Sequence, residues 1–121
     1  MDAFSLPKKT DEEKAARQQA VQEATRYATE VPFKTMNLCY ECMSVAKAMA
    51  EIGNPNSVTD AGVGALAARA GVMGAFLNVK INAAGLEDKA FAEKIIQEGE
   101  TIAAKANQLE AEILQIVNSK I

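Results

Sequence analysis

The spacing of apolar residues constrains this 121-residue sequence most strongly. Apolar side chains recur every three or four positions through long segments, and the clusters of turn-forming residues at 53–56 and 83–85 interrupt them. This spacing gives a helix one apolar face. The alternation at residues 77–82 would also suit a short strand, but the sequence shows no partner strand. The pattern therefore predicts an all-α chain.

Helix starts and stops are marked by single residues. Thr10 and Glu13 predict a capping box at the first helix, where Asp11, Glu12 and Glu13 suit the positive helix end. Pro32 removes a backbone donor and clashes with the carbonyl four residues earlier, so we expect a kink or a break there. Gly53 is expected to end the next helix as a left-handed terminator.

The remaining two helices are predicted from Ser57 and from residues 87–88. Ser57 and Asp60 suggest a second capping box, and Glu87 or Asp88 is expected to open a last helix of about thirty residues, or about 45 Å. We therefore predict an antiparallel bundle of about four helices that forms a single helical domain over residues 1–121.

Two surfaces within these helices stand out. Leu38, Cys42, Val45, Met49 and Ile52 form an apolar row beside a second row through Met36 and Met43, which predicts a helix with a wide apolar face. The next helix is apolar on most sides and is expected to pack centrally. Its glycines are explained either by close helix packing or by the approach of a ligand: Gly62, Gly64, Gly71 and Gly74.

Composition excludes several classes of function. Thirteen basic and sixteen acidic residues give a net charge of −3, which argues against nucleic-acid binding. Because the chain has no histidine, a Ser-His-Asp triad, a Cys-His dyad and a His-ligated metal are excluded. Cys39 and Cys42 lack further ligands for zinc, so we predict no metal and assign both thiols to packing. No apolar run suggests a signal peptide or a membrane span, so we expect a cytoplasmic protein without membrane contact.

Asp60 and two asparagines are the candidate polar site. Asp60 is either a first-turn carboxylate at a helix start or an acid-base group beside Asn54 and Asn56. Asn78 and Asn82 fall on the same helix face as Asp60, and their amides require hydrogen-bond partners. Asp60 and Asn78 are about 27 Å apart along a straight helix. They would therefore serve opposite ends of an elongated ligand or act across a dimer interface.

Three segments carry a resemblance to a known family. Residues 6–17, which begin Leu-Pro-Lys-Lys-Thr-Asp-Glu-Glu, resemble the Leu-Pro-Lys segment and acidic helix start of the cyclodeaminase/cyclohydrolase family. Residues 53–63 and 74–82 resemble its Gly-Asn-x-x-x-x-Ser-Asp and Asn-Val-x-Ile-Asn motifs, with Thr59 where the family usually has serine. The resemblance is to the C-terminal part of the family domain, so we expect its N-terminal part, with a glycine-rich segment, to be absent here.

The resemblance implies an all-helical homodimer that acts on a tetrahydrofolate derivative, as a formimidoyltetrahydrofolate cyclodeaminase that releases ammonia or as a methenyltetrahydrofolate cyclohydrolase that adds water. Neither reaction needs a metal or a redox cofactor, and a carboxylate tuned by burial can transfer the protons. On this basis Asp60 is the predicted catalytic residue, and the predicted substrate-binding residues are Lys8, for the glutamyl tail, and Asn54, Asn56, Asn78 and Asn82. The alternative is a truncated, noncatalytic helical module for dimerisation or interaction.

Overall fold

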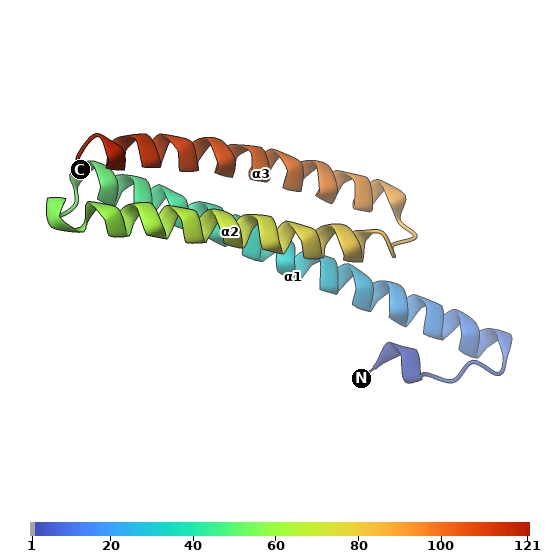
Figure 1. Cartoon of the computed structure of the whole chain (residues 1–121). Helices are drawn as coiled ribbons and strands as arrows, with labels where there is room; N and C mark the ends of the chain where they lie inside the picture. The colour runs from blue at the N-terminus through green and yellow to red at the C-terminus, as the bar shows by residue number, and fades with distance from the viewer. Residues whose placement is uncertain (1) are drawn as a thin grey trace.

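The computed structural model describes residues 2–121 as three helices and two short turns of 3-10 helix (Figure 1). The order is η1 (Ala3–Ser5), α1 (Asp11–Ile52), η2 (Pro55–Ser57), α2 (Val58–Ala83) and α3 (Lys89–Asn118). The predicted all-α class is confirmed, and residues 77–82 belong to α2. The predicted count of about four helices is wrong, because residues 11–52 form one helix of 42 residues.

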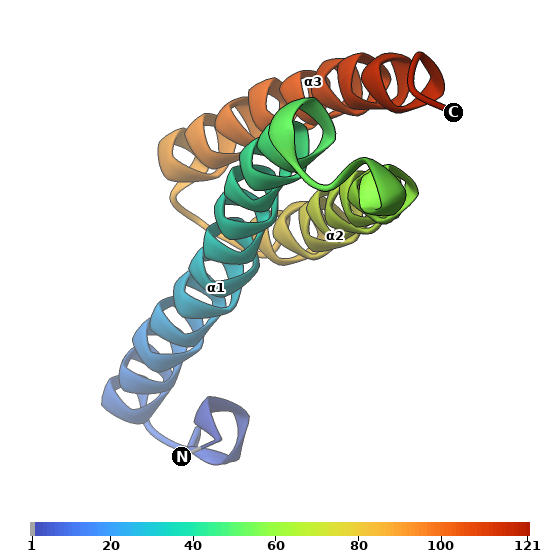
Figure 2. The ribbon, with the colours of Figure 1, turned by 90° about the vertical axis from the view of Figure 1, so that its left-hand side faces the viewer.

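The three helices pack along one another, and α1 is the longest. α2 runs back beside the C-terminal half of α1, and α3 lies along both, while the N-terminal part of α1 projects beyond its neighbours (Figures 1 and 2). The core lies where the three helices meet, and its largest fully buried apolar side chains are Met36, Met43, Val72, Val79 and Ile113.

Pro32 lies inside α1 without breaking it. Because proline has no amide hydrogen, residue 32 cannot donate to the carbonyl oxygen of Ala28, and that oxygen has no backbone partner in the helix. In the structure Nδ2 of Asn82, on α2, donates to that carbonyl oxygen at 2.8 Å. Of the kink or break expected at Pro32, the break is wrong: α1 is continuous from Asp11 to Ile52, and a side chain 54 residues away replaces the missing backbone donor.

The helix starts agree with the sequence except at α2. Thr10 and Glu13 form the expected capping box, and the Asp88 side chain accepts from the amide of Phe91. Ser57 precedes α2 but makes no side-chain capping bond, so the second capping box is wrong. The turn is held instead by Asn54, whose Oδ1 accepts from the backbone amide of Asn56 at 3.0 Å.

Gly53 ends α1 for a steric reason rather than through a left-handed backbone. Its φ of −74° and ψ of −176° are extended, so the expected left-handed terminator is wrong. A Cβ at this position would lie 2.4 Å from the carbonyl oxygen of Met49. Glycine is therefore required because the chain turns tightly against the last turn of the helix.

Close helix packing, one of the two explanations that the sequence left open, applies to two of the four glycines of α2. A Cβ on Gly71 would lie 2.8 Å from Sγ of Cys39, and one on Gly62 would touch Val117, so these two allow close helix packing. Gly64 and Gly74 have no such neighbour within 4 Å. α2 therefore packs against α1 and α3 on two sides only, and its third side is exposed.

Large apolar side chains remain exposed on this third side of α2 and on the adjoining side of α1. They include Val45, which is 63% exposed, and Leu77, which is 64% exposed. Within residues 2–121, only the segment Pro55–Ala83 has the length and mean hydropathy, 1.4, of a helix that could cross a membrane. One third of its most apolar window is buried in the fold.

Candidate functional site

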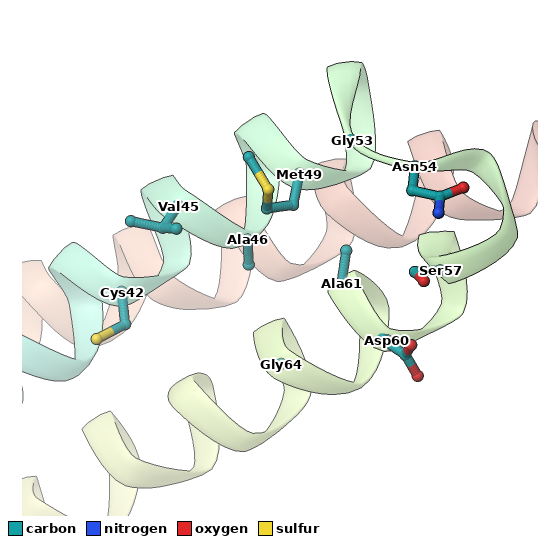
Figure 3. Close-up of a pocket in the computed structure, with 10 residues that line it drawn as sticks. All are labelled: Cys42, Val45, Ala46, Met49, Gly53, Asn54, Ser57, Asp60, Ala61 and Gly64. Carbon is teal, nitrogen blue, oxygen red and sulfur yellow. The ribbon is translucent and has the colours of Figure 1, made fainter.

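The turn between α1 and α2 opens into a mostly apolar hollow that contains Asp60. We call it the Asp60 hollow; its volume is about 510 Å³. Figure 3 shows Ala46 and Ala61 pointing toward one another between the helices, while Asp60 points away from α1. The lining residues are Cys42, Val45, Ala46, Met49, Gly53, Asn54, Ser57, Asp60, Ala61 and Gly64.

Asp60 is the only ionisable carboxylate that lines this hollow. It lies in the first turn of α2, where the helix dipole favours a negative charge. Its side chain is exposed and makes no hydrogen bond or ion pair within residues 2–121. The carboxylate is therefore free to accept a proton or a hydrogen bond from a ligand, and the single chain does not shield it from water.

The two asparagines of the turn differ in what they offer. Oδ1 of Asn54 is occupied by the amide of Asn56, while Nδ2 of Asn54 donates to no group within residues 2–121. Asn56 is exposed on the 3-10 turn and does not line the hollow. The structure thus brings Asn54, but not Asn56, to the hollow that contains Asp60.

Asn78 and Asn82 line a second hollow, also of about 510 Å³, at the other end of α2. Nδ2 of Asn78 donates to the carbonyl of Gly74 in its own helix at 3.2 Å, and Asn82 donates to Ala28. Oδ1 of each amide accepts no hydrogen bond within residues 2–121. This Asn78 hollow is lined by Ala28, Val31, Pro32, Thr35, Gly71, Gly74, Ala75, Asn78 and Asn82, none of which is ionisable.

The two hollows lie in the same groove between α1 and α2, but they are separate. α2 is unbroken from Val58 to Ala83, so Asp60 and Asn78 remain about 27 Å apart along its axis. The close contact between Cys39 and Gly71 lies between the hollows. The candidate acid and the candidate amides therefore do not meet in one chain.

Lys8 is farther still from Asp60. It is exposed in the segment between η1 and α1, whereas the Asp60 hollow lies at the other end of α1. The 42 residues of that helix correspond to about 63 Å. One chain cannot bring Lys8 and Asp60 to the same small ligand.

The sequence did not identify the apolar walls of the Asp60 hollow as part of a site. Cys42, Val45 and Met49 had been assigned to a packed helix face, yet Cys42 is exposed and only Cys39 packs against a neighbouring helix. The signal that could have found them is an apolar row on α1 that is wider than two neighbouring helices can cover.

Comparison with known proteins gives consistent results. A family model described as "Formiminotransferase-cyclodeaminase" matches residues 1–101. The whole chain is 48% identical to a methenyltetrahydrofolate cyclohydrolase of Methylorubrum extorquens and covers 58% of it. Over 86% of its length the chain is 36% identical to a formimidoyltransferase-cyclodeaminase of Mus musculus, of which it covers 20%. Over 99% of its length it is 32% identical to the formimidoyltransferase-cyclodeaminase of Gallus gallus, of which it covers 22%.

Proposed function

Because the chain belongs to the formiminotransferase-cyclodeaminase family, we propose that it takes part in folate one-carbon metabolism as a methenyltetrahydrofolate cyclohydrolase. The observation that carries this choice is the 48% identity, over the whole chain, to a protein named for that activity. The chain spans little more than half of that relative's length. The activity is therefore proposed for the site to which these residues contribute.

The reaction adds water to the cationic methenyl carbon of the substrate. The water oxygen bonds to that carbon and loses one proton, which gives a hydroxyl on a tetrahedral carbon. That hydroxyl then loses its second proton as the carbonyl forms, and one of the two carbon–nitrogen bonds breaks as its nitrogen takes up a proton. The product is formyltetrahydrofolate, with one proton released overall. A group that accepts and returns a proton at a tetrahedral carbon is what this chemistry requires, and it requires neither a metal nor a redox cofactor.

Asp60 is proposed as that proton-transfer group. Three features support the assignment: an unpaired carboxylate, its position in the first turn of α2, and the mostly apolar hollow around it. Nδ2 of Asn54 is available there for a substrate oxygen or for a water molecule. Asn78 and Asn82 are proposed to hold the polar part of the folate through their free Oδ1 atoms, and Lys8 and Asn56 remain candidates for the anionic tail and the pterin.

A second candidate is the cyclodeaminase reaction, because the chain is also 36% identical to a protein named for it. There a substrate nitrogen attacks the formimino carbon and ammonia leaves, which again needs proton transfer at a tetrahedral carbon. The two reactions are separated by their products. One assay follows the loss of methenyltetrahydrofolate absorbance, and the other measures ammonia released from formiminotetrahydrofolate.

Asp60→Asn tests the catalytic assignment. We expect turnover to fall by about 10²-fold or more while folate binding is retained, because the amide cannot take the proton. Glu100→Gln, an exposed acid of α3 away from both hollows, is the control and should leave turnover unchanged. Unchanged turnover in Asp60→Asn would mean that Asp60 only stabilises the helix start. A wild-type chain that folds and dimerises but turns over neither substrate would support the noncatalytic module.

A further inference from the structure

The hydrogen bond between Asn82 and Ala28 fixes which end of the Asn82 amide is left for a ligand. A carbonyl oxygen only accepts hydrogen bonds, so the amide group that faces it must be the nitrogen. Nδ2 of Asn82 lies 2.8 Å from the carbonyl oxygen of Ala28, and Oδ1 accepts no hydrogen bond within residues 2–121. Asn82 is half-buried and lines the Asn78 hollow. This side chain therefore offers the hollow an acceptor oxygen.

Pro32 is the reason that this carbonyl is available. In an ordinary stretch of helix the backbone amide of residue 32 would donate to Ala28, and the Asn82 side chain would compete with it. Proline has no amide hydrogen, so Nδ2 of Asn82 is the donor that the carbonyl receives. Pro32 is itself half-buried in the wall of the same hollow. A backbone feature of α1 thus determines the orientation of a side chain on α2.

The other polar side chains of the hollow have the same polarity. Nδ2 of Asn78 donates to the carbonyl of Gly74 at 3.2 Å, and Oγ1 of Thr35 donates to the carbonyl of Val31 at 3.2 Å. In the described part of the chain, neither Oδ1 of Asn78 nor Oγ1 of Thr35 accepts a hydrogen bond. The hollow therefore has three side-chain oxygens as acceptors, which suits a ligand that brings N–H groups.

Charge and shape narrow the class of ligand further. No residue that lines the hollow is ionisable, and on the adjoining side Glu30 and Lys34 carry opposite charges. Acceptor oxygens without a cation disfavour a carboxylate or a phosphate, because the anion would lose its water without gaining a charged donor. A Cβ on Gly74 would meet no atom within 4 Å, so the α2 wall has open space there. A volume of about 510 Å³ between small side chains suits a flat, uncharged heterocycle.

We infer that Pro32 is a positioning residue of the folate site, and that the Asn78 hollow takes the pterin rather than the glutamyl tail. By leaving the Ala28 carbonyl without a helical donor, Pro32 holds the Asn82 amide with its oxygen available to the ligand. The pterin carries an exocyclic amino group beside a ring N–H, which together form a donor edge, whereas the glutamyl tail carries carboxylates. The naming of the pterin rests on the proposed function, but the role of Pro32 in orienting Asn82 does not.

The orientation of Asn82 can be measured without a ligand, by NMR of the exchange of side-chain amide hydrogens with water. In the wild-type chain an Nδ2 hydrogen of Asn82 should exchange about fivefold more slowly than those of Asn56, whose side chain makes no hydrogen bond within residues 2–121. In Pro32→Ala this protection should be lost, while the rates of Asn78, which donates to Gly74, stay the same. Unchanged protection of Asn82 in Pro32→Ala would overturn the role of Pro32.

Titration calorimetry with a tetrahydropterin that lacks the glutamyl tail tests whether the orientation matters for binding. Pro32→Ala and Asn82→Ala should each raise the dissociation constant about fivefold, because each loses one neutral hydrogen bond to the ligand. The double variant should bind no more weakly than Asn82→Ala, since Pro32 acts through Asn82. Asn37→Ala, on the same helix but lining neither hollow, is the control and should bind as the wild type does. Additive losses would mean that Pro32 only touches the ligand, and would overturn its positioning role.

Two further probes test the polarity of the hollow. A tetrahydropterin without its exocyclic amino group should bind the wild-type chain about fivefold more weakly than the parent compound, and this difference should disappear in Asn82→Ala. The anionic remainder of folate, p-aminobenzoylglutamate, should not depend on Asn82; if it is the probe that does, the hollow takes anions and the pterin assignment is wrong. A wild-type chain that binds none of these probes would count against the proposed function and the pterin assignment together, while the exchange rates of Asn82 still decide the role of Pro32.

Discussion

The hydrogen bond from Asn82 to the carbonyl of Ala28 should stabilise the fold only while residue 32 is proline. Pro32 has no amide hydrogen, so the Ala28 carbonyl depends on Nδ2 of Asn82 at 2.8 Å. Asn82→Ala should therefore destabilise the wild-type fold. With alanine at position 32, the backbone amide closes the helical bond to Ala28, and the side chain of Asn82 becomes dispensable.

The magnitude follows from the environment of the bond. A neutral hydrogen bond contributes about 0.5–1.5 kcal/mol net, and Ala28 is exposed enough for water to replace part of it. We expect Asn82→Ala to cost about 1 kcal/mol in the wild type and about 0.3 kcal/mol or less in Pro32→Ala. Pro32→Ala should itself stabilise the chain by as much as about 3 kcal/mol, since proline is the poorest residue inside a helix.

The assay is urea unfolding followed by the circular dichroism of the helices, with all four chains of the double-mutant cycle at one concentration. The concentration must be fixed because association would add to the apparent stability. Asn78→Ala is the control, since Asn78 donates only within its own helix and should cost the same in both backgrounds. If Asn82→Ala also costs the same in both, the carbonyl freed by Pro32 is not what Asn82 satisfies, and the explanation of the unbroken helix is wrong.

Two further predictions concern packing and a helix end. Gly99→Ala should destabilise the fold by about 1–2 kcal/mol, because the new Cβ would lie 2.5 Å from the buried ring of Phe76. Gly64→Ala has no such neighbour within 4 Å and should stabilise the fold by about 0.5–1 kcal/mol. Thermal unfolding of both variants gives the sign of each change. Lys120→Met should cost about 1 kcal/mol in urea unfolding, because Nζ donates to the carbonyls of Ala50 and Glu51 at the end of α1, while Lys105→Met on exposed α3 should be neutral.

The parts of the fold that depend on neighbouring residues could be predicted from the sequence. Thr10 and Asp88 cap the helices that follow them, and α3 has the thirty residues that its apolar spacing indicated. Capping bonds span three residues, and a helical stripe repeats every three or four, so both are visible in a short window. The same window does not reveal what a residue meets elsewhere in the fold.

Pro32 and Gly99 show where this reasoning ends. The proline rule is local and predicts a kink or a break, but α1 continues as one helix, and the side chain that replaces the missing donor, Asn82, lies beside it in space and 54 residues away in sequence. Gly99 lies within an ordinary helical pattern, and only the tertiary structure shows the ring of Phe76 against it. In both cases the decisive partner is on another helix.

The candidate site was predictable in its residue types but not in its assembly. The Asp60 hollow has one carboxylate and an asparagine whose Oδ1 is already bonded, and the Asn78 hollow has two free amide oxygens and no ionisable group. Proton transfer without polar anchoring, or anchoring without proton transfer, would leave either hollow incomplete for the proposed reaction. Because one unbroken helix fixes the distance between them, no rearrangement within α2 joins the two sets.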